Sequence, residues 1–161
     1  TEQWDYWQLM NYSNGLLLND QKHQLKIFGA YALTPEWTVG ANLFIASGHP
    51  KTCLGYFGPS GTDDPISYGS SYHWCDGKPT PRGTTGFTPW TRQLNLNIDY
   101  RPSWAQKRLD FNLAIFNVLN EQKPLQYMAG FGEPGAYSAT YDLPIQFETP
   151  RFARFSVSYE W

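Results

Sequence analysis

The sequence predicts an all-β fold in which long antiparallel strands form part of a transmembrane β-barrel. Three observations lead to this prediction: a composition rich in aromatic and turn residues, strands of bilayer-spanning length, and connections that alternate between short and long. The 161 residues include 7 Trp, 11 Tyr and 10 Phe together with 14 Gly and 12 Pro. Aromatic residues interrupted by Gly and Pro favour strands and turns over helices.

Charge and hydropathy exclude two other classes of protein. The formal net charge is −2, whereas a nucleic-acid surface needs a clustered excess of Lys and Arg. The mean hydropathy is −0.51, and no apolar run approaches the roughly 18 residues of a membrane-spanning helix. Hydropathy does not exclude a membrane barrel, because a barrel strand is apolar only at alternate positions.

Five segments alternate between apolar and polar residues. The clearest is 92–101, in which Leu94, Leu96 and Ile98 are separated by polar side chains. The others are 23–33, 37–47, 108–120 and 151–161. A strand of about 11 residues tilted by about 45° rises roughly 25 Å, the height of the apolar band of an outer-membrane barrel. Strands of soluble sandwiches are usually about half as long.

Residues before 23 are less regular. Their aromatic and apolar positions hint at a sixth strand, followed by a turn at Asn14-Gly15; these positions are Trp4, Tyr6, Leu9 and Tyr12. Aromatic residues also gather near the ends of the five clearer segments, as the interfacial girdle of a barrel requires. They are Tyr31, Trp37, Tyr100, Trp104, Tyr159 and Trp161.

The connections fall into two alternating classes. Segments 34–36 and 102–107 are short, whereas 48–91 and 121–150 are long and rich in Gly, Pro, Ser and Tyr. Such long loops are unusual in a compact soluble domain. Outer-membrane barrels have short periplasmic turns and long extracellular loops. Since both long segments fall on the same side of the predicted sheet, we expect them to be extracellular loops.

Several short motifs, taken in chain order, resemble the C-terminal end of TonB-dependent outer-membrane receptors of the Oar-like branch. They are Phe28-Gly29-Ala30-Tyr31, Trp37-Thr38-Val39-Gly40-Ala41-Asn42, Pro81-Arg82-Gly83, Thr88-Pro89-Trp90-Thr91, Phe116-Asn117-Val118-Leu119-Asn120 and Thr149-Pro150-Arg151-Phe152. A last strand that ends on an aromatic residue follows them. Trp161 occupies this final position, where Phe is commoner in the family.

The resemblance implies a barrel of about 22 strands with an N-terminal plug and a motif that engages TonB. Residues 1–161 would then be the C-terminal part of this barrel, without the plug and the TonB-interacting motif. The expected function is ligand uptake across the outer membrane of a Gram-negative bacterium. The ligand is an unidentified small molecule, sugar or peptide, and the expected partners are outer-membrane lipid, the barrel assembly machinery and TonB.

In this family the last strand is thought to be the signal for barrel assembly. The resemblance assigns that role to the segment from Arg151 onward, through its aromatic and apolar residues Phe155, Val157, Tyr159 and Trp161.

Cys53 and Cys75 lie in a Gly-, Pro- and Ser-rich stretch, which favours an exposed disulfide in an oxidising compartment over two free thiols. Closing this loop would contribute about 3 kcal/mol. The same loop contains His49, His73, Asp63, Asp64 and Asp76. Their spacing, including that of His73 and Cys75, matches no zinc pattern, so we expect no metal and no cofactor.

Two arguments weigh against an enzyme. Adjacent carboxylates such as Asp63 and Asp64 point apart, which is wrong for acid and base catalysis across one bond. The sequence also has no nucleophile-elbow motif and no phosphate-binding loop.

The loops offer candidate ligand contacts, because aromatic side chains can stack on sugars or peptides. The candidates are Tyr56, Tyr68, Tyr72, Trp74, Trp90 and Arg82, with Phe57 and Phe87 nearby. The competing interpretation is that these rings pack the loop against itself. The sequence does not decide whether the side chains of Arg92, Arg151 and Arg154 point into a polar barrel interior or lie at the membrane rim.

A soluble, aromatic-rich β-sandwich that binds carbohydrate is the alternative function. In it, the apolar residues of the strands would form a core instead of facing lipid, and residues 48–91 would be the recognition surface.

Overall fold

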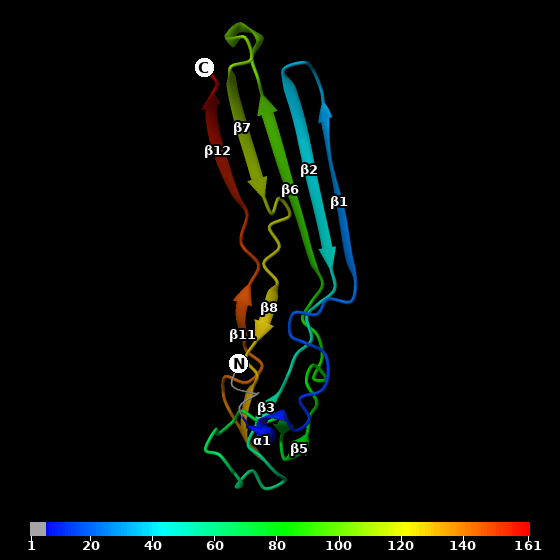
Figure 1. The fold of residues 1–161 in the computed structure, drawn as a ribbon, viewed down its shortest axis with the longest axis vertical. Helices are drawn as coiled ribbons and strands as arrows, with labels where there is room; N and C mark the ends of the chain where they lie inside the picture. Colours follow the sequence, from blue (N-terminus) through cyan, green and yellow to red (C-terminus); the bar gives the residue numbers. More distant parts are fainter. Residues whose placement is uncertain (1–5) are drawn as a thin grey trace. The chain divides into compact units, whose positions relative to one another are not determined.

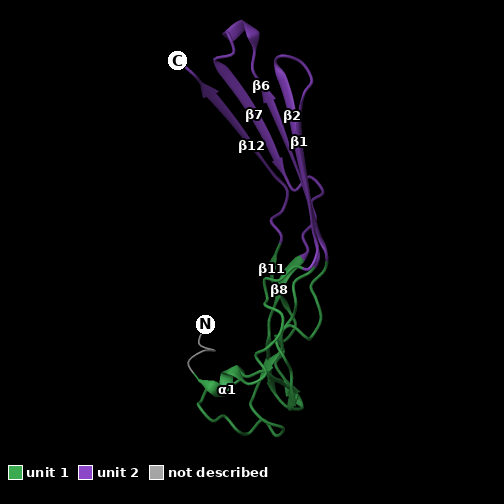
Figure 2. Ribbon diagram, turned by 45° about the vertical axis from the view of Figure 1, so that its right-hand side comes forward, with its two compact units in different colours: residues 1–21, 48–89, 124–147 green, residues 22–47, 90–123, 148–161 purple. Residues whose placement is uncertain are grey.

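The computed structural model describes residues 6–161, which divide into two compact units (Figure 2). Of the described residues, unit 1 comprises 6–21, Gly48–Pro89 and Pro124–Phe147, and unit 2 comprises Lys22–Ser47, Trp90–Lys123 and Glu148–Trp161. The fold is all-β, as predicted, with one α-helical turn in the part described. No helix within residues 6–161 is long and apolar enough to cross a membrane.

Unit 2 is one five-stranded antiparallel sheet in the order β1-β2-β6-β7-β12 (Figure 1). Its strands are β1 Gln24–Ala32, β2 Trp37–Ala46, β6 Thr91–Tyr100, β7 Leu109–Phe116 and β12 Phe152–Tyr159. The five segments predicted from alternation are therefore confirmed as strands.

The register of the sheet collects the apolar residues on one face. Leu43 lies opposite Leu94, and Val39 opposite Ile98. Further along the sheet, Ile98 lies opposite Leu113, which in turn lies opposite Phe155. Because strand side chains alternate between faces, the polar residues between them share the other face.

Both faces of this sheet remain open to solvent within unit 2. Every residue of β1 and of β12 is exposed. Large apolar side chains are among them: Ile27 is 55% exposed and Phe155 64% exposed. The sheet is thus a single layer with an uncovered apolar face, and its edge strands are β1 and β12.

The polar face carries a hydrogen-bond network and a hollow. The Asn112 Nδ2 amide donates to Asn97 Oδ1 at 2.9 Å and to Asp99 Oδ1 at 2.5 Å. A hollow of about 430 Å³ lies beside it, where Gly40 and Ala114 leave space. The polar face is therefore hollowed at this point.

The two short connections lie at one end of the sheet, together with the C-terminus (Figure 1). The Glu36 carboxylate joins them by accepting hydrogen bonds from the Ser103 hydroxyl and from the Ser103 backbone amide, the latter at 2.8 Å. The Ser103 hydrogen bonds lower the pKa of Glu36. Ser103 begins a short 3₁₀ helix, Ser103–Ala105. At the same end, Trp37 stacks on Tyr100 with ring centroids 4.4 Å apart.

Unit 1 is built from short elements. Its helix is α1 Trp7–Met10, and its strands are β3 Leu54–Gly55, β4 Trp74–Cys75, β5 Lys78–Pro79, β8 Pro124–Tyr127, β9 Gly130–Glu133, β10 Ala136–Tyr137 and β11 Pro144–Phe147. They form sheets β10-β9-β3, β11-β8 and β4-β5. The β3–β9 pair is parallel and joins the two long segments of the chain.

The predicted sixth strand is wrong. Leu9 belongs to α1 and is 1% exposed, so one helical turn directs it into the core of unit 1. Tyr6 precedes this helix, and Tyr12 has a left-handed backbone with φ of 60° that is incompatible with a strand. The turn lies at Asn11-Tyr12, whereas Gly15 forms a bridge with Arg82. Trp4 lies outside the described residues.

The strand expected over 108–120 ends at Phe116, because Asn117 and Asn120 have φ of 50° and 53°. Asn117 is 2% exposed. Its Nδ2 amide donates to the carbonyl oxygens of Glu121 and Thr149, both at 2.8 Å. This side chain therefore fixes the chain on both sides of the long connection that leaves β7.

Replacing Asn117 is expected to destabilise unit 2. Asn117→Ala removes two hydrogen bonds and forces a Cβ-bearing aliphatic residue into a left-handed backbone, for a loss of about 3 kcal/mol. Asn117→Gly relieves the backbone strain alone and is expected to lose about 1 kcal/mol less. Urea unfolding of the whole chain, followed by tryptophan fluorescence, measures both. Equal stability of Asn117→Ala and the wild type would contradict this role.

Candidate functional site

A disulfide holds the centre of unit 1. Cys53 and Cys75 are joined with their Cα atoms 5.8 Å apart. Cys53 is completely buried, with 0% exposure. The bond links the residue before β3 to the end of β4 and closes the long segment between β2 and β6 upon itself. The disulfide interpretation of these two cysteines is therefore supported over free thiols.

Asp64 and Tyr72 form a second link inside the same segment. The Tyr72 hydroxyl donates to Asp64 Oδ1 at 2.5 Å, and the backbone amides of Tyr68 and Gly69 donate to the same carboxylate at 2.9 and 2.8 Å. Burial raises the pKa of Asp64, but hydrogen bonds from Tyr72 and three backbone amides outweigh burial and leave it lowered. Burial and then Asp64 raise the pKa of Tyr72 to about 12.

His73 is buried next to these links without a hydrogen bond. Its exposure is 0%, and neither Nδ1 nor Nε2 has a hydrogen-bond partner among the described residues. Burial, together with the nearby positive charge of Arg82, lowers the pKa of His73 to about 4. The imidazole is therefore neutral at pH 7, with one N–H donor and one lone pair.

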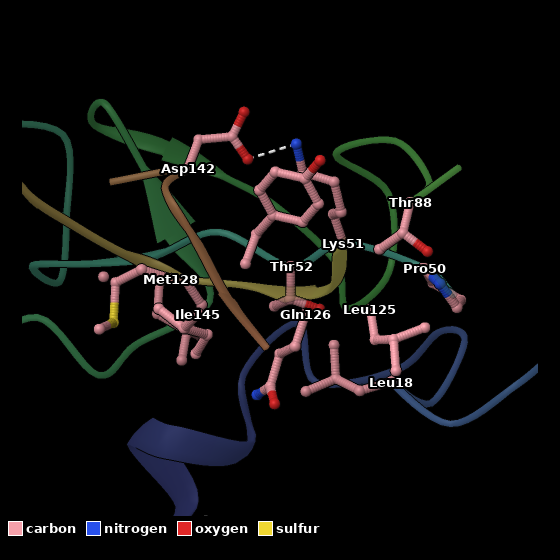
Figure 3. A pocket seen from close by; sticks show the side chains of 14 residues that line it. Leu18, Pro50, Lys51, Thr52, Thr88, Leu125, Gln126, Met128, Asp142 and Ile145 are labelled. Atoms are coloured by element: carbon pink, nitrogen blue, oxygen red, sulfur yellow. Dashed lines mark ion pairs between the residues drawn. The ribbon is translucent and has the colours of Figure 1, made fainter. Parts of the chain in front are cut away.

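Two neighbouring cavities lie in unit 1. The first, of about 280 Å³, contains the ion pair of Lys51 and Asp142 (Figure 3). The Lys51 ammonium also lies 4.3 Å from the centre of the Tyr127 ring. The second cavity, of about 380 Å³, is lined by His73 and Arg82. Both cavities share the lining residues Leu18, Thr52, Leu54 and Ala129.

The aromatic residues predicted as ligand contacts do not form one cluster in the structure. Tyr72 is 0% exposed and acts in packing, which is the competing interpretation. Tyr68 lies edge-on to Tyr6 with centroids 5.5 Å apart, and Trp74 lies 5.5 Å from Phe57. Tyr56 is half-buried, and its backbone amide donates to the Gly132 carbonyl.

Two members of the predicted set are placed differently. Trp90 belongs to unit 2, where it stacks on His23 with centroids 6.0 Å apart and is 52% exposed. Arg82 lines the second of the two cavities described above. Sequence reasoning missed Lys51, Tyr127 and Asp142, because no local pattern connects residues so far apart in the chain.

The three arginines whose surroundings the sequence leaves open all lie in unit 2. Arg154 is on the polar face of the sheet, opposite Ala114. Arg92 pairs with Glu121, and the Arg151 backbone amide donates to Asn120 Oδ1 at 3.0 Å. Within residues 6–161 no group of three or more His, Cys, Asp or Glu side chains is arranged to hold a metal ion.

The residues proposed for barrel assembly lie on the edge strand. Phe155, Val157 and Tyr159 are opposite Leu113, Phe111 and Leu109 of β7. They are 64%, 52% and 57% exposed, and Trp161 is fully exposed. The second edge of β12 has no strand partner in the described chain.

Fold and site together define an all-β chain with one uncovered amphipathic sheet and a disulfide-linked unit of long connections. This chain is similar to a C-terminal piece of the TonB-dependent transporter Oar of Myxococcus xanthus. The two are 28% identical over 197 residues, which cover 96% of this chain and 17% of that protein. No protein-family model matches the chain. No solved structure matches it.

Removal of the disulfide is expected to loosen unit 1. The double variant Cys53→Ser, Cys75→Ser should lose about 3 kcal/mol through the greater freedom of the unfolded loop. Trypsin cleavage after Lys51 or Arg82 should then accelerate by about 100-fold, which the bands of a digestion time course measure. Reduced wild-type protein is the matched control and should behave in the same way. Unchanged cleavage of both would contradict a stabilising disulfide.

His73 is expected to make unit 1 sensitive to acid. Its pKa is about 4 when folded, against an ordinary 6.5, so protons favour the unfolded chain below pH 6.5. The stability contributed by neutral His73 is complete above pH 6.5 and falls by about 3 kcal/mol on acidification to about pH 4. Urea unfolding at a series of pH values measures it.

His73→Phe is the matched variant, since it keeps a ring of similar volume without a titrating group. It should lose the part of the pH dependence that lies between pH 6.5 and 4. Asp64 does not interfere, because its lowered pKa confines its effect to more acidic solution. Identical slopes for the two proteins in this window would show that His73 is not the titrating group.

Proposed function

We propose that this chain is the C-terminal barrel wall of a TonB-dependent outer-membrane receptor that takes up a ligand across the outer membrane of a Gram-negative bacterium. The observation that carries the proposal is the continuous apolar face of the five-stranded sheet, which no layer of unit 2 covers. An apolar surface of this extent requires lipid or protein against it. The similarity to a transporter favours lipid.

The dimensions of the sheet support a membrane location. β2 and β6 each have 10 residues, and strands of this length tilted by about 45° span roughly 25 Å of hydrocarbon. The polar face carries the Asn97, Asp99 and Asn112 network, which suits the polar interior of a barrel. One apolar and one polar face on a single layer of strands are the arrangement that a barrel wall needs.

The edges of the sheet support a larger assembly. Unpaired N–H and C=O groups cost several kcal/mol each in hydrocarbon, so β1 and β12 each require a neighbouring strand in a membrane. We propose that these neighbours belong to a longer chain, with a plug and a TonB-engaging motif beyond residues 1–161. Phe155, Val157, Tyr159 and Trp161 then present the closing strand to the assembly machinery.

The connections suggest which end faces outward. The short turns at Glu36 and Ser103 lie at the end of the sheet opposite to the strand ends from which both long connections leave. In the proposed receptor the short turns are periplasmic, and unit 1 is extracellular. Oxidation of Cys53 and Cys75 agrees with an exported location. Tyr56, Tyr68 and Trp74 of unit 1 remain proposed ligand contacts, as does Trp90 of unit 2.

Arginine substitutions on the two faces of the sheet test the proposal. In the full-length protein, Leu113→Arg places a charge on the lipid face at a cost of about 2 to 4 kcal/mol, which should reduce the amount inserted. Ser156→Arg is the matched control, because Ser156 lies on the polar face next to Phe155. An antibody against residues 49–91, applied to separated membranes, measures both.

The expected result is an outer-membrane band larger than 18.5 kDa that Leu113→Arg depletes and Ser156→Arg preserves. A soluble band at that mass would overturn the proposal. It would instead favour the carbohydrate-binding sandwich, which needs a second sheet over the apolar face.

A further inference from the structure

The hollow on the polar face of unit 2 is elongated across the strands. Its volume of about 430 Å³ falls in the range of ligand pockets, which begins at about 300 Å³. Neighbouring strands lie about 4.8 Å apart, so a row of residues that crosses four strands is about 14 Å long. Such a row, running from β1 to β7 in the register of the sheet, forms the floor: Ala30, Gly40, Asn97 and Ala114.

Larger side chains stand along one side of this floor. Phe28 lies opposite Asn42, and Asn42 lies opposite Asn95. Phe116 continues the same side on β7. Phe28 is 81% exposed, so its ring is open to a ligand. Asn95 Oδ1 accepts a hydrogen bond from the Asn117 backbone amide at 2.9 Å, which leaves the Asn95 Nδ2 group as a donor beside the hollow.

A positive charge closes the hollow at its β12 end. Arg154 lies opposite Ala114, and its guanidinium lies over the Phe116 ring, 5.6 Å from the ring centre. Among the described residues no Asp or Glu lines the hollow, and none pairs with Arg154. The Asp99 carboxylate in the next row already accepts hydrogen bonds from the network on this face. The charge of the lining therefore favours an anionic ligand.

We propose that this hollow binds an elongated carboxylate with a flat apolar group at its other end and an amide between them. The Arg154 guanidinium donates to the carboxylate, whose geometry its planar fork matches. The side-chain amides of Asn42 and Asn95 supply the donor and acceptor groups that the ligand amide needs. The apolar group packs against the Phe28 ring. Acylated amino acids are compounds of this class.

This inference concerns the polar face of unit 2, whereas the receptor proposal rests on the apolar face, so either can fail without the other. The test is equilibrium binding to the full protein, purified from whichever cell fraction it accumulates in. The probe is hippurate, and the comparison is hippuramide, in which a neutral amide replaces the carboxylate. Saturation-transfer NMR titration measures both, and hippuramide is expected to bind about tenfold or more weakly.

Two charge variants test the role of the guanidinium. Arg154→Gln should weaken binding of hippurate by about tenfold. Lys26→Gln is the matched control, because it removes the same charge from the same face outside the hollow, where the Lys26 ammonium lies over the Phe44 ring. Lys26 and Arg154 lie four strands apart in the sheet, about 19 Å, which is beyond the screening length of about 8 Å in physiological salt. Lys26→Gln should therefore bind as the wild type does.

Two glycine variants test the hollow itself. Gly40→Val fills the floor, and the new Cβ meets no atom closer than 3.6 Å, so the sheet has room for it. Binding of hippurate should fall by about tenfold or more. Gly29→Val is the matched control, because Gly29 precedes Ala30 on β1 and its new side chain lies on the opposite face. A Cβ at Gly29 meets nothing within 4 Å, and this variant should bind as the wild type does.

A wild-type tryptophan fluorescence spectrum shows that each variant has folded. The inference is overturned if folded wild-type protein binds neither probe, since water or another part of the protein then fills the hollow. It is equally overturned if hippuramide binds as well as hippurate, or if Gly40→Val and Arg154→Gln bind like the wild type. A loss in Lys26→Gln as large as that in Arg154→Gln would show attraction to the whole face, and would also overturn it.

Discussion

The register of the five-stranded sheet is the constraint on which the rest of unit 2 depends. Because side chains alternate along a strand, a slip of one residue would move every apolar side chain to the other face. The observed register aligns Val39, Ile98, Leu113 and Phe155 across neighbouring strands. It also brings Asn97, Asp99 and Asn112 together on the polar face. One pairing scheme thus creates both the apolar surface and the polar network.

Unit 1 is stabilised in a different way, because its strands are too short to form a sheet with a hydrophobic core. Its buried centre is small and includes Leu9, Cys53, Tyr72 and His73. The disulfide limits the unfolded chain, and the Asp64 carboxylate gathers the Tyr72 hydroxyl and the backbone amides of Tyr68 and Gly69. In unit 1, covalent and polar links therefore supply stability that larger domains obtain from buried apolar area.

Local patterns predicted the long strands and the disulfide, whereas long-range pairings were invisible in the sequence. Alternation along 92–101 is a property of ten adjacent residues and therefore identified β6. The β3–β9 pair joins residues more than seventy positions apart through strands of two and four residues, too short to leave a periodic signal. The aromatic spacing before residue 23 was misleading because burial of Leu9 favours a helical turn.

The aromatic residues show why composition alone did not locate the candidate site. Trp37 and Tyr100 stack at the end of the sheet, whereas Tyr72 and Trp74 pack inside unit 1. The same residue type thus serves two structural roles, and neither role requires a ligand. A buried polar atom without a partner does not separate these roles either, because the Trp74 indole nitrogen and both His73 ring nitrogens lack hydrogen-bond partners in the described chain. Which rings are buried depends on pairings between distant residues, and it therefore emerges only when the fold is known.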